Sequence, residues 1–595
     1  MASELPSIAV IADAHFHDIF GDYGAAGFTV SDRAMALRPF ANTVRSTRVF
    51  NESSAALPYA LDDIAARGIR HVVLLGDYSD DGQLATMAAL RKRLDDYARR
   101  FGMRFYAVPG NHDIFGPGGR HRSKRFLNAR GGRDLVTSNP KRKAAPDDDA
   151  VIISVSMYCA GYPEGLRSLG DVGFFRKPDY LHWETPFGID DHPSAREFEI
   201  RSPDGLTVRR LMDASYLIEP FDGVWMLMID ANVFVPVDRE TGDGEGAFTD
   251  STDAGWNAML VHKRFILDWI RSVTDRARTL GKTVIAFSHY PALDPLDSTR
   301  HDERAVLGQT SLLGRIPELD VGDALIDAGI RLHFSGHLHV NDTARHRNAN
   351  GFLFNISVPS LVAFPGAYKI VHIGPHRLDI ETISIDDMKL DADILRQYST
   401  EVERDRINPG ALLQSANYGE FLSKHLAHLV GRRFLRREWP EELGEAVKTL
   451  GLLDLAALAL VERPIRSGAI ADLKAAIADS DIQQQLAASA IEHELDFTSL
   501  SRIEVMTFLG DWYRVRMGSD LGLDVISKPH LAAYKWVSGI YAPRMNAITP
   551  GSMQEAFGRL FQMFDRFISG LPSRDFVIDL TTGEIQQLAL HKCLA

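Results

Sequence analysis

Residues 72–113 read VVLLGDYSDDGQLATMAALRKRLDDYARRFGMRFYAVPGNHD. The apolar runs at residues 72–75 and 104–108 are typical of buried strands, and residues 83–101 between them have the spacing of a helix. This alternation predicts parallel strands in a sheet covered by helices. Each strand is followed by a turn with polar side chains, Gly76-Asp77 after the first and Gly110-Asn111-His112-Asp113 after the second.

The same alternation continues in both directions along the chain. Towards the N-terminus, residues 7–12 predict a strand and residues 57–67 a helix. Later strands are expected at residues 223–230, 283–288 and 331–335, and later helices at 260–280 and 322–328. Residues 352–356, 368–373 and 377–385 then predict three successive antiparallel strands. The expected fold class is therefore α/β.

Two regions depart from this alternation. Residues 115–220, approximately, have little periodicity and contain Gly-Gly and Pro-rich turns, which predicts a large insertion over the rim of the sheet. Residues 386–595 are rich in Ala, Leu, Glu and Arg at helical spacing. We therefore expect one domain over residues 1–385, with the insertion inside it, and a mostly helical C-terminal region over residues 386–595.

Five polar clusters directly follow predicted strands. They are Asp13-Ala14-His15, Gly76-Asp77, Gly110-Asn111-His112-Asp113, Ser288-His289 and Gly336-His337-Leu338-His339. Ligands in open α/β sheets bind outside the carboxyl ends of the strands, so these clusters are expected to meet in one crevice. Each cluster alone is often only a turn or a packed histidine, whereas the whole set in this order is specific.

The residue types in these clusters predict a metal site. Asp, Asn and His supply oxygen and imidazole nitrogen without thiolate, which suits Mn, Fe, Zn or Ni. A carboxylate can bridge two metal ions, and ions about 3.5–4 Å apart can hold both the attacking and the leaving oxygen of a phosphoryl transfer. We therefore expect two divalent or trivalent transition-metal ions that act on a phosphate ester.

Together, the clusters resemble the signature of the calcineurin-like metallophosphoesterase superfamily, which runs D-x-H, GD-x-x-D, GNH(D/E), H and GH-x-H. The resemblance covers residues 8–385, apart from the insertion, and implies a four-layer α/β/β/α sandwich. The metal ligands that it implies are Asp13, His15 and His339 for one ion, Asn111, His289 and His337 for the second, and Asp77 for both.

The resemblance also implies roles for residues around the metal ions. His112 is expected beside the substrate as a general acid or electrostatic stabiliser, and Asp113 is expected to hold His112 by a hydrogen bond. Asp80 matches the supporting acid of the family and is expected to orient a ligand or a loop. His17 and Tyr290 are further candidates for substrate contact, although for His17 we favour a position that faces solvent.

The expected reaction is hydrolysis of a small phosphodiester, in which a hydroxide shared by the metal ions attacks phosphorus and His112 protonates the leaving oxygen. The alternative is a phosphomonoesterase that acts on a small phosphorylated metabolite or nucleotide. A minor alternative is a scaffold protein that acts through the C-terminal helices. Scaffold relatives typically lose metal ligands, and this chain retains them all.

Composition limits the partners and the location. The formal net charge of −13 disfavours long nucleic acid, so a small phosphorylated substrate is expected. Two cysteines exclude a disulfide framework and a multi-thiolate zinc site. Because no apolar run reaches the ~18 residues of a membrane span and residues 1–12 do not resemble a signal peptide, the expected location is the cytoplasm. The C-terminal region could also form a homo-oligomer.

Overall fold

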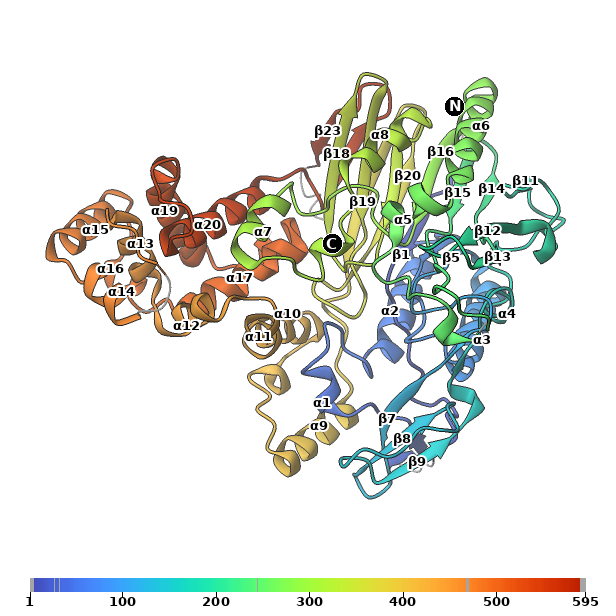
Figure 1. Ribbon diagram of the computed structural model, residues 1–595, viewed down its shortest axis with the longest axis horizontal. Helices are drawn as coiled ribbons and strands as arrows, with labels where there is room; N and C mark the ends of the chain where they lie inside the picture. The colour runs from blue at the N-terminus through green and yellow to red at the C-terminus, as the bar shows by residue number, and fades with distance from the viewer. Residues whose placement is uncertain (1–4, 26, 31–32, 243, 467–469, 589–595) are drawn as a thin grey trace. The chain divides into compact units, whose positions relative to one another are not determined.

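The computed structural model describes residues 5–25, 27–30, 33–242, 244–466 and 470–588. The chain divides into two compact units. The first unit comprises residues 1–295, 315–422 and 572–595, and the second comprises residues 296–314 and 423–571. Figure 1 labels the helices and strands along the chain, from blue at the N-terminus to red at the C-terminus.

The first unit contains two seven-stranded sheets, and the first of these begins with the predicted β-α-β stretch. Its strands β1 (Ile8–Ile11), β4 (His71–Leu75) and β5 (Arg104–Val108) run parallel. Antiparallel strands extend this sheet beyond β1, in the order β20 (Ala367–Ile373), β21 (Arg377–Ser384), β22 (Phe576–Asp579) and β23 (Ile585–Gln587). The residues of β1 are all buried, as expected for a parallel strand covered on both faces.

The second sheet also has a parallel centre. Its parallel strands are β15 (Val224–Ile229), β16 (Thr283–Ser288), β17 (Leu332–Ser335) and β19 (Gly351–Ser357). Antiparallel strands lie at its edges, β14 (Tyr216–Phe221) and β11 (His182–Glu184) on one side and β18 (Asp342–Asn348) on the other. Strands β5 and β15 bring the two sheets into contact.

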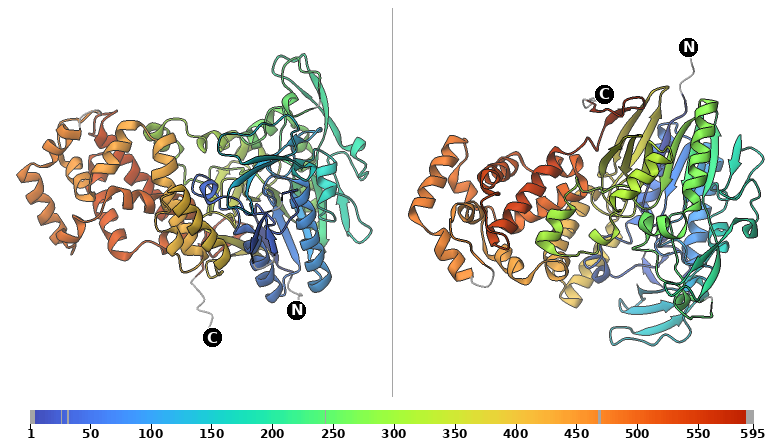
Figure 2. Two further views of the ribbon diagram at one scale, coloured as in Figure 1. Left: turned by 90° about the horizontal axis from the view of Figure 1, so that it is seen from below. Right: turned by 45° about the horizontal axis from the view of Figure 1, so that its top comes forward.

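Helices pack on both sheets. Helix α3 (Leu84–Phe101) packs on β5, and α2 (Ser53–Ala66) precedes β4 in the chain. Helix α6 (Phe265–Leu280) packs on β16, and α8 (Leu319–Asp327) packs on β18 and β19. The buried residues of α6 recur three or four positions apart, which places them on one helix face. The predicted α/β/β/α fold is confirmed, and Figure 2 shows the strands and flanking helices from two further directions.

The strands predicted at residues 352–356, 368–373 and 377–385 are present, and the second and third pair antiparallel as predicted, but the prediction that the first is their antiparallel neighbour is wrong. Strand β19 pairs in parallel with β17 in the second sheet, whereas β20 and β21 belong to the first. An apolar run predicts that a strand forms but does not identify its partner. The edge strand β18, with the sequence DTARHRN, was not predicted because it is polar and only its first two residues are buried.

The regular structure of the predicted insertion is mainly short β-strands joined by loops. Strands β7 (Ser123–Leu127), β8 (Arg133–Thr137) and β9 (Ala150–Ile153) form a three-stranded sheet. A small hydrophobic core joins this sheet to the N-terminal segment through Tyr23, Ala36, Phe126, Val136 and Met157. This core holds β7 in place, and β7 carries Lys124 into the charged cluster described below.

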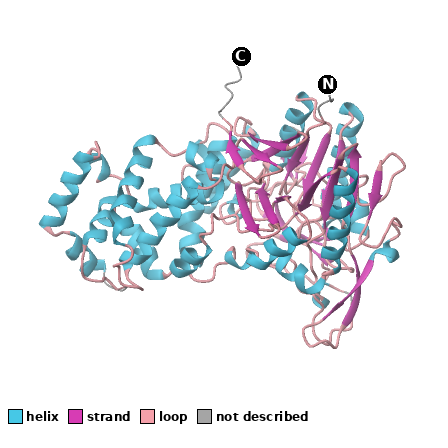
Figure 3. Cartoon of the chain, turned by 90° about the horizontal axis from the view of Figure 1, so that it is seen from above, coloured by secondary structure: helices cyan, strands magenta, loops and turns pink. Residues whose placement is uncertain are grey.

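In its described residues, the second unit consists of helices and loops, drawn in cyan and pink in Figure 3. Its longer helices include α13 (Leu452–Leu460), α17 (Val505–Gly518), α19 (Lys528–Tyr541) and α20 (Met553–Ser569). Aromatic side chains fill its core, where the rings of Phe508 and Phe561 stack with centroids 4.5 Å apart. The predicted helices of the C-terminal region are confirmed, but β22 and β23 near its end belong to the first sheet. No helix in the described ranges is both long enough and apolar enough to cross a membrane.

Candidate metal centre

Two groups of buried Asp and His side chains lie at the carboxyl ends of four strands of the first unit. One group consists of Asp13 and His15 after β1 together with His339 after β17, and the other consists of Asp77 after β4, His289 after β16 and His337 after β17. In each group, the potential ligand atoms lie within 4.8 Å of one another, close enough to hold a metal ion. Four of the five sequence clusters therefore meet here, because parallel strands present their carboxyl ends at one edge.

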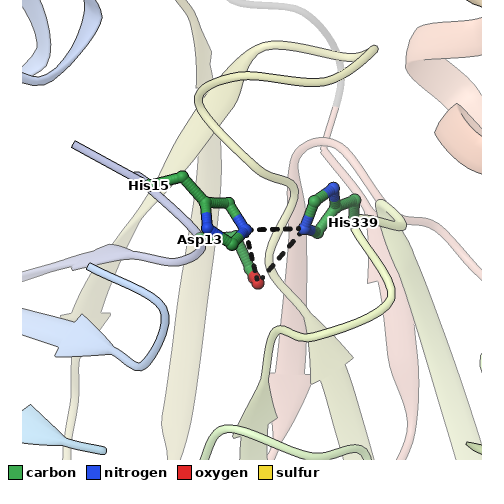
Figure 4. Close-up of side chains that lie close together, drawn as sticks. All are labelled: Asp13, His15 and His339. Atoms are coloured by element: carbon green, nitrogen blue, oxygen red, sulfur yellow. Dashed lines mark hydrogen bonds and ion pairs between the residues drawn. The ribbon is translucent and has the colours of Figure 1, made fainter. Parts of the chain in front are cut away.

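In the first group, three side chains point towards one another (Figure 4). His15 Nε2 lies 3.2 Å from His339 Nε2 and 3.9 Å from Asp13 Oδ1, and His339 Nε2 lies 3.3 Å from the same oxygen. Asp13 Oδ1 is buried and has no hydrogen-bond partner among the described residues. Burying such an atom without a partner costs free energy, so the donor set fits a cation that all three atoms can share.

The second group has a similar geometry and includes an amide. His289 Nε2 lies 3.4 Å from Asp77 Oδ2, 3.2 Å from His337 Nδ1 and 3.3 Å from Asn111 Oδ1. Asn111 follows β5, and its Nδ2 donates to the Thr252 hydroxyl at 3.1 Å. The amide oxygen of Asn111 is therefore turned towards His289, where it could bind the same metal ion.

Asp77 lies between the two groups. Its Oδ2 atom is 3.7 Å from His15 Nε2 in one group and 3.4 Å from His289 Nε2 in the other. Its Oδ1 atom accepts a hydrogen bond from the backbone N–H of His112 at 2.8 Å. Asp13 is held in the same way, since its Oδ2 accepts from the backbone N–H of His337 at 2.9 Å. In both carboxylates, one oxygen is fixed by a hydrogen bond from a neighbouring loop, and the other faces the imidazole nitrogens of the ligand groups.

Backbone carbonyls set the orientation of two imidazoles. His289 Nδ1 donates to the carbonyl of Leu75 at 3.0 Å, and His337 Nε2 donates to the carbonyl of Thr252 at 3.0 Å. Because these nitrogens carry the protons, His289 Nε2 and His337 Nδ1 keep their lone pairs for a metal ion. Thr252 lies in a loop without a recognisable motif, and sequence analysis did not identify it.

The loops that carry the ligands have a strained backbone. Asp13, His15, Asp77, His337 and His339 all have φ between 39° and 69°, a region that residues other than glycine rarely adopt. Close packing between the loops also requires glycine at two positions. A Cβ atom on Gly110 would lie 2.1 Å from Asp77 Oδ1, and one on Gly336 would lie 2.4 Å from Asp13 Oδ2.

Burial and neighbouring charges set the protonation of the histidines. Burial, reinforced by Arg48, lowers the pKa of His15 well below its usual value, and burial does the same to His337. For His289, burial also favours the neutral form, but the charges of Asp77 and Asp13 outweigh it and raise the pKa to about 9. A positive charge is therefore favoured between His289 and the two carboxylates, and a metal ion would compete there with the proton.

His112 is held by an acid that sequence analysis missed. Its Nδ1 lies 2.5 Å from Asp81 Oδ1, and its Nε2 lies 4.0 Å from Asp77 Oδ2. The prediction that Asp113 holds His112 is wrong. Asp113 Oδ1 instead accepts from the backbone N–H and hydroxyl of Ser79, and its Oδ2 accepts from the backbone N–H of Gly110. Asp113 thus ties two ligand loops together, because the turn directs its side chain away from the imidazole.

A charged cluster adjoins His112. Asp80 is buried, and its oxygens contact Arg38 at 3.0 Å and Arg48 at 3.1 Å. Burial raises the pKa of Asp80, but Lys124, Arg38 and Arg48 outweigh burial and hold the pKa well below its usual value. Asp80 therefore positions arginines, one of which reaches His112, rather than contacting an atom of the two ligand groups itself. Sequence analysis did not single out Arg38, Arg48 or Lys124.

The two further candidates for substrate contact are both buried. His17 Nε2 donates to the carbonyl of Ala36 at 2.8 Å, and its Nδ1 lies 3.1 Å from the Tyr23 hydroxyl. The expectation that His17 faces solvent is therefore wrong. The Tyr290 ring packs against His337 with centroids 4.4 Å apart, and its hydroxyl donates to Asn232 Oδ1 at 3.0 Å. Tyr290 thus supports the His337 ring from within the fold, and His17 is held by Ala36 and Tyr23.

Comparison with known families agrees with this geometry. Residues 6–193 match the sequence model of the calcineurin-like phosphoesterase family. This match contains the first three of the five motifs and confirms the predicted resemblance to a metal-dependent phosphoesterase family of hydrolases. The motifs at His289 and at His337 to His339 lie outside the matched residues.

Among solved structures, the chain is similar to a dimetal phosphatase from Danio rerio at 13% identity, over 64% of this chain and 97% of that chain, with a TM-score of 0.27. No curated protein matches the chain. The two groups of His and Asp side chains could each hold a metal ion.

Proposed function

We propose that the phosphoesterase domain hydrolyses a small phosphodiester with two bound transition-metal ions, Mn, Fe or Zn. Asp13, His15 and His339 would hold one ion, and Asn111, His289 and His337 the other, with Asp77 shared between them. The observation that carries the proposal is the position of Asp77 Oδ2, 3.7 Å from His15 Nε2 and 3.4 Å from His289 Nε2.

When bound, the two ions would activate a water molecule and neutralise charge on the phosphoryl group. The protein supplies the remaining functions. The ligand loops fix the carboxylate and imidazole donors before substrate arrives, which avoids reorganisation during the reaction. His112 is the proposed general acid for the leaving oxygen, because its Nε2 faces the site while Asp81 orients the ring through Nδ1.

A phosphomonoesterase activity is the second candidate, and one observation favours it. The guanidinium group of Arg48 lies beside the site, with Nη1 3.4 Å from His112 Nε2. A phosphomonoester carries more negative charge than a diester and would gain more from a fixed positive charge.

Metal content and turnover, measured on the same samples, test the proposal. The full chain would be stripped with chelator, reconstituted with Mn²⁺, Fe²⁺ or Zn²⁺, and assayed with bis-p-nitrophenyl phosphate and p-nitrophenyl phosphate. We expect about two ions per chain and diester hydrolysis that depends on them. Asp77→Asn should lose metal and activity together, whereas Asp95→Asn, on the exposed face of α3, should retain both. Wild-type turnover in metal-free protein would contradict the proposal.

A further inference from the structure

Arg48 is held rigidly beside the metal centre by contacts on several sides. Its Nη2 donates to the Asp80 carbonyl at 2.8 Å and to Asp80 Oδ1 at 3.1 Å. Its guanidinium carbon lies 5.6 Å from the centroid of the Phe50 ring, and its side chain is only 12% exposed. A side chain fixed in this way loses little further conformational freedom when it binds a ligand.

The charge of Arg48 exceeds what Asp80 needs for compensation. Asp80 already pairs with Arg38 at 3.0 Å, and Lys124 lies 3.6 Å from its Oδ2. The neighbouring Asp81 pairs with Arg122 at 3.2 Å and also contacts Lys124. Three guanidinium groups therefore face two carboxylates within this cluster of described residues. Since arginine stays protonated in proteins, at least one positive charge is left over.

The surplus charge is directed at the site where the phosphoryl group would react. Arg48 Nη1 lies 3.4 Å from His112 Nε2, and that nitrogen lies 4.0 Å from Asp77 Oδ2. Nη1 has no carboxylate partner among the described residues. A guanidinium group that served only to neutralise Asp80 would have no need to extend one N–H past it towards the imidazole.

We propose that Arg48 binds a phosphoryl oxygen that the two metal ions leave free, and that this contact makes phosphomonoesters substrates of the site in addition to diesters. The inference rests on the proposed function and names its second substrate class. A monoester has three non-bridging oxygens, so an anionic oxygen would remain for Arg48 beside those that bound metal ions would take. In a diester, the corresponding position is an esterified oxygen, which is a weaker acceptor for a charged donor.

Comparing the two substrates tests this assignment. In metal-loaded Arg48→Met, kcat/KM for p-nitrophenyl phosphate should fall about 10- to 100-fold, the range expected for one charge-assisted hydrogen bond. Diester hydrolysis should change much less, and inhibition by inorganic phosphate should weaken with monoester turnover. Free guanidinium should partly restore the monoester activity. Arg45→Met, at an exposed arginine three residues away, is the matched control and should leave both activities unchanged.

The remaining outcomes are also decisive. Equal losses on both substrates, or no loss on the monoester with both metal ions bound, would overturn the role of Arg48. If the wild-type protein binds two metal ions but cleaves neither substrate, the proposed function fails. Calorimetric binding of inorganic phosphate to the wild type and to Arg48→Met would then decide whether Arg48 binds the anion. If Arg48→Met does not fold, Arg48→Lys, which keeps the charge but loses the planar fork, replaces it in both measurements and should show a smaller loss in the same direction.

Discussion

The acid that orients His112 can be tested by removing its charge alone. Asp81 Oδ1 lies 2.5 Å from His112 Nδ1, and the Asp81 side chain is only 7% exposed, so water compensates little for a loss of this bond. In Asp81→Asn, an amide of nearly the same shape replaces the carboxylate. A hydrogen bond to a charged group contributes about 1.5–3 kcal/mol. At about 1.36 kcal/mol per factor of ten, kcat should fall roughly 10- to 150-fold.

The assay is steady-state hydrolysis of bis-p-nitrophenyl phosphate with saturating Mn²⁺, and metal content is measured on the same sample. Asp95→Asn is the matched control, because Asp95 is an exposed acid whose closest cation, Arg91, is 3.7 Å away. We expect Asp81→Asn to keep both metal ions and its folded state while kcat falls. A kcat within about twofold of wild type, with full metal content, would refute the role assigned to Asp81. Metal loss in step with activity would also refute it, since Asp81 would then act on the ligand loops.

Three further changes test the support of the site. Burial raises the pKa of Glu52 from 4.5 to about 7. Between these pH values the folded chain retains a proton that the unfolded chain releases. The free energy of unfolding should therefore fall by up to about 3 kcal/mol as the pH rises through this window. Glu52→Gln should remove that dependence. If wild type and Glu52→Gln had the same unfolding midpoint at pH 5 and again at pH 8, the prediction would be wrong. Gly110→Ala places a methyl group against Asp77 Oδ1 and should abolish binding of both metal ions, measured by calorimetry, whereas Gly539→Ala, with open space around its Cβ, should not. Asn232 donates to the carbonyls of Pro109 and Gly110 and accepts from Tyr290. Asn232→Ala should therefore weaken binding of the ion assigned to Asn111, His289 and His337 about 10- to 100-fold more than binding of the other ion. Equal weakening of both ions would count against that role.

The ligand groups could be predicted from the sequence because each ligand directly follows an apolar strand. Asp13, Asp77 and His289 follow strands whose buried runs are readable, and parallel pairing brings these strand ends together. The supporting residues could not be predicted in this way. Asp80 and Asp81 are adjacent in a tight loop, and only the backbone conformation decides which carboxylate reaches His112.

Residues that arrive from irregular segments were also beyond prediction. Arg48 lies in a loop before α2 that carries no motif, and its place beside His112 depends on contacts with Asp80 and Phe50. Strand pairing posed a similar difficulty. The alternation of apolar residues located β19 and β20 correctly but could not assign them to different sheets. Local patterns determine whether an element forms, whereas its partner depends on residues distant in the chain.

The pairing of β21 with β22 makes most of the helical unit an insertion in the chain between two neighbouring strands of one sheet. Residues 377–380 of β21 pair directly with residues 576–579 of β22, so one hydrogen-bonded ladder closes a loop of nearly two hundred residues that contains most of the helical unit. The chain therefore leaves the first unit after β21 and the residues that follow it, and it returns to the same sheet at β22. A single proteolytic cut within residues 423–571 would leave two polypeptides held together by the hydrogen bonds of this ladder. Truncation after β21 would remove two strands from the sheet and expose an unpaired edge strand that promotes aggregation.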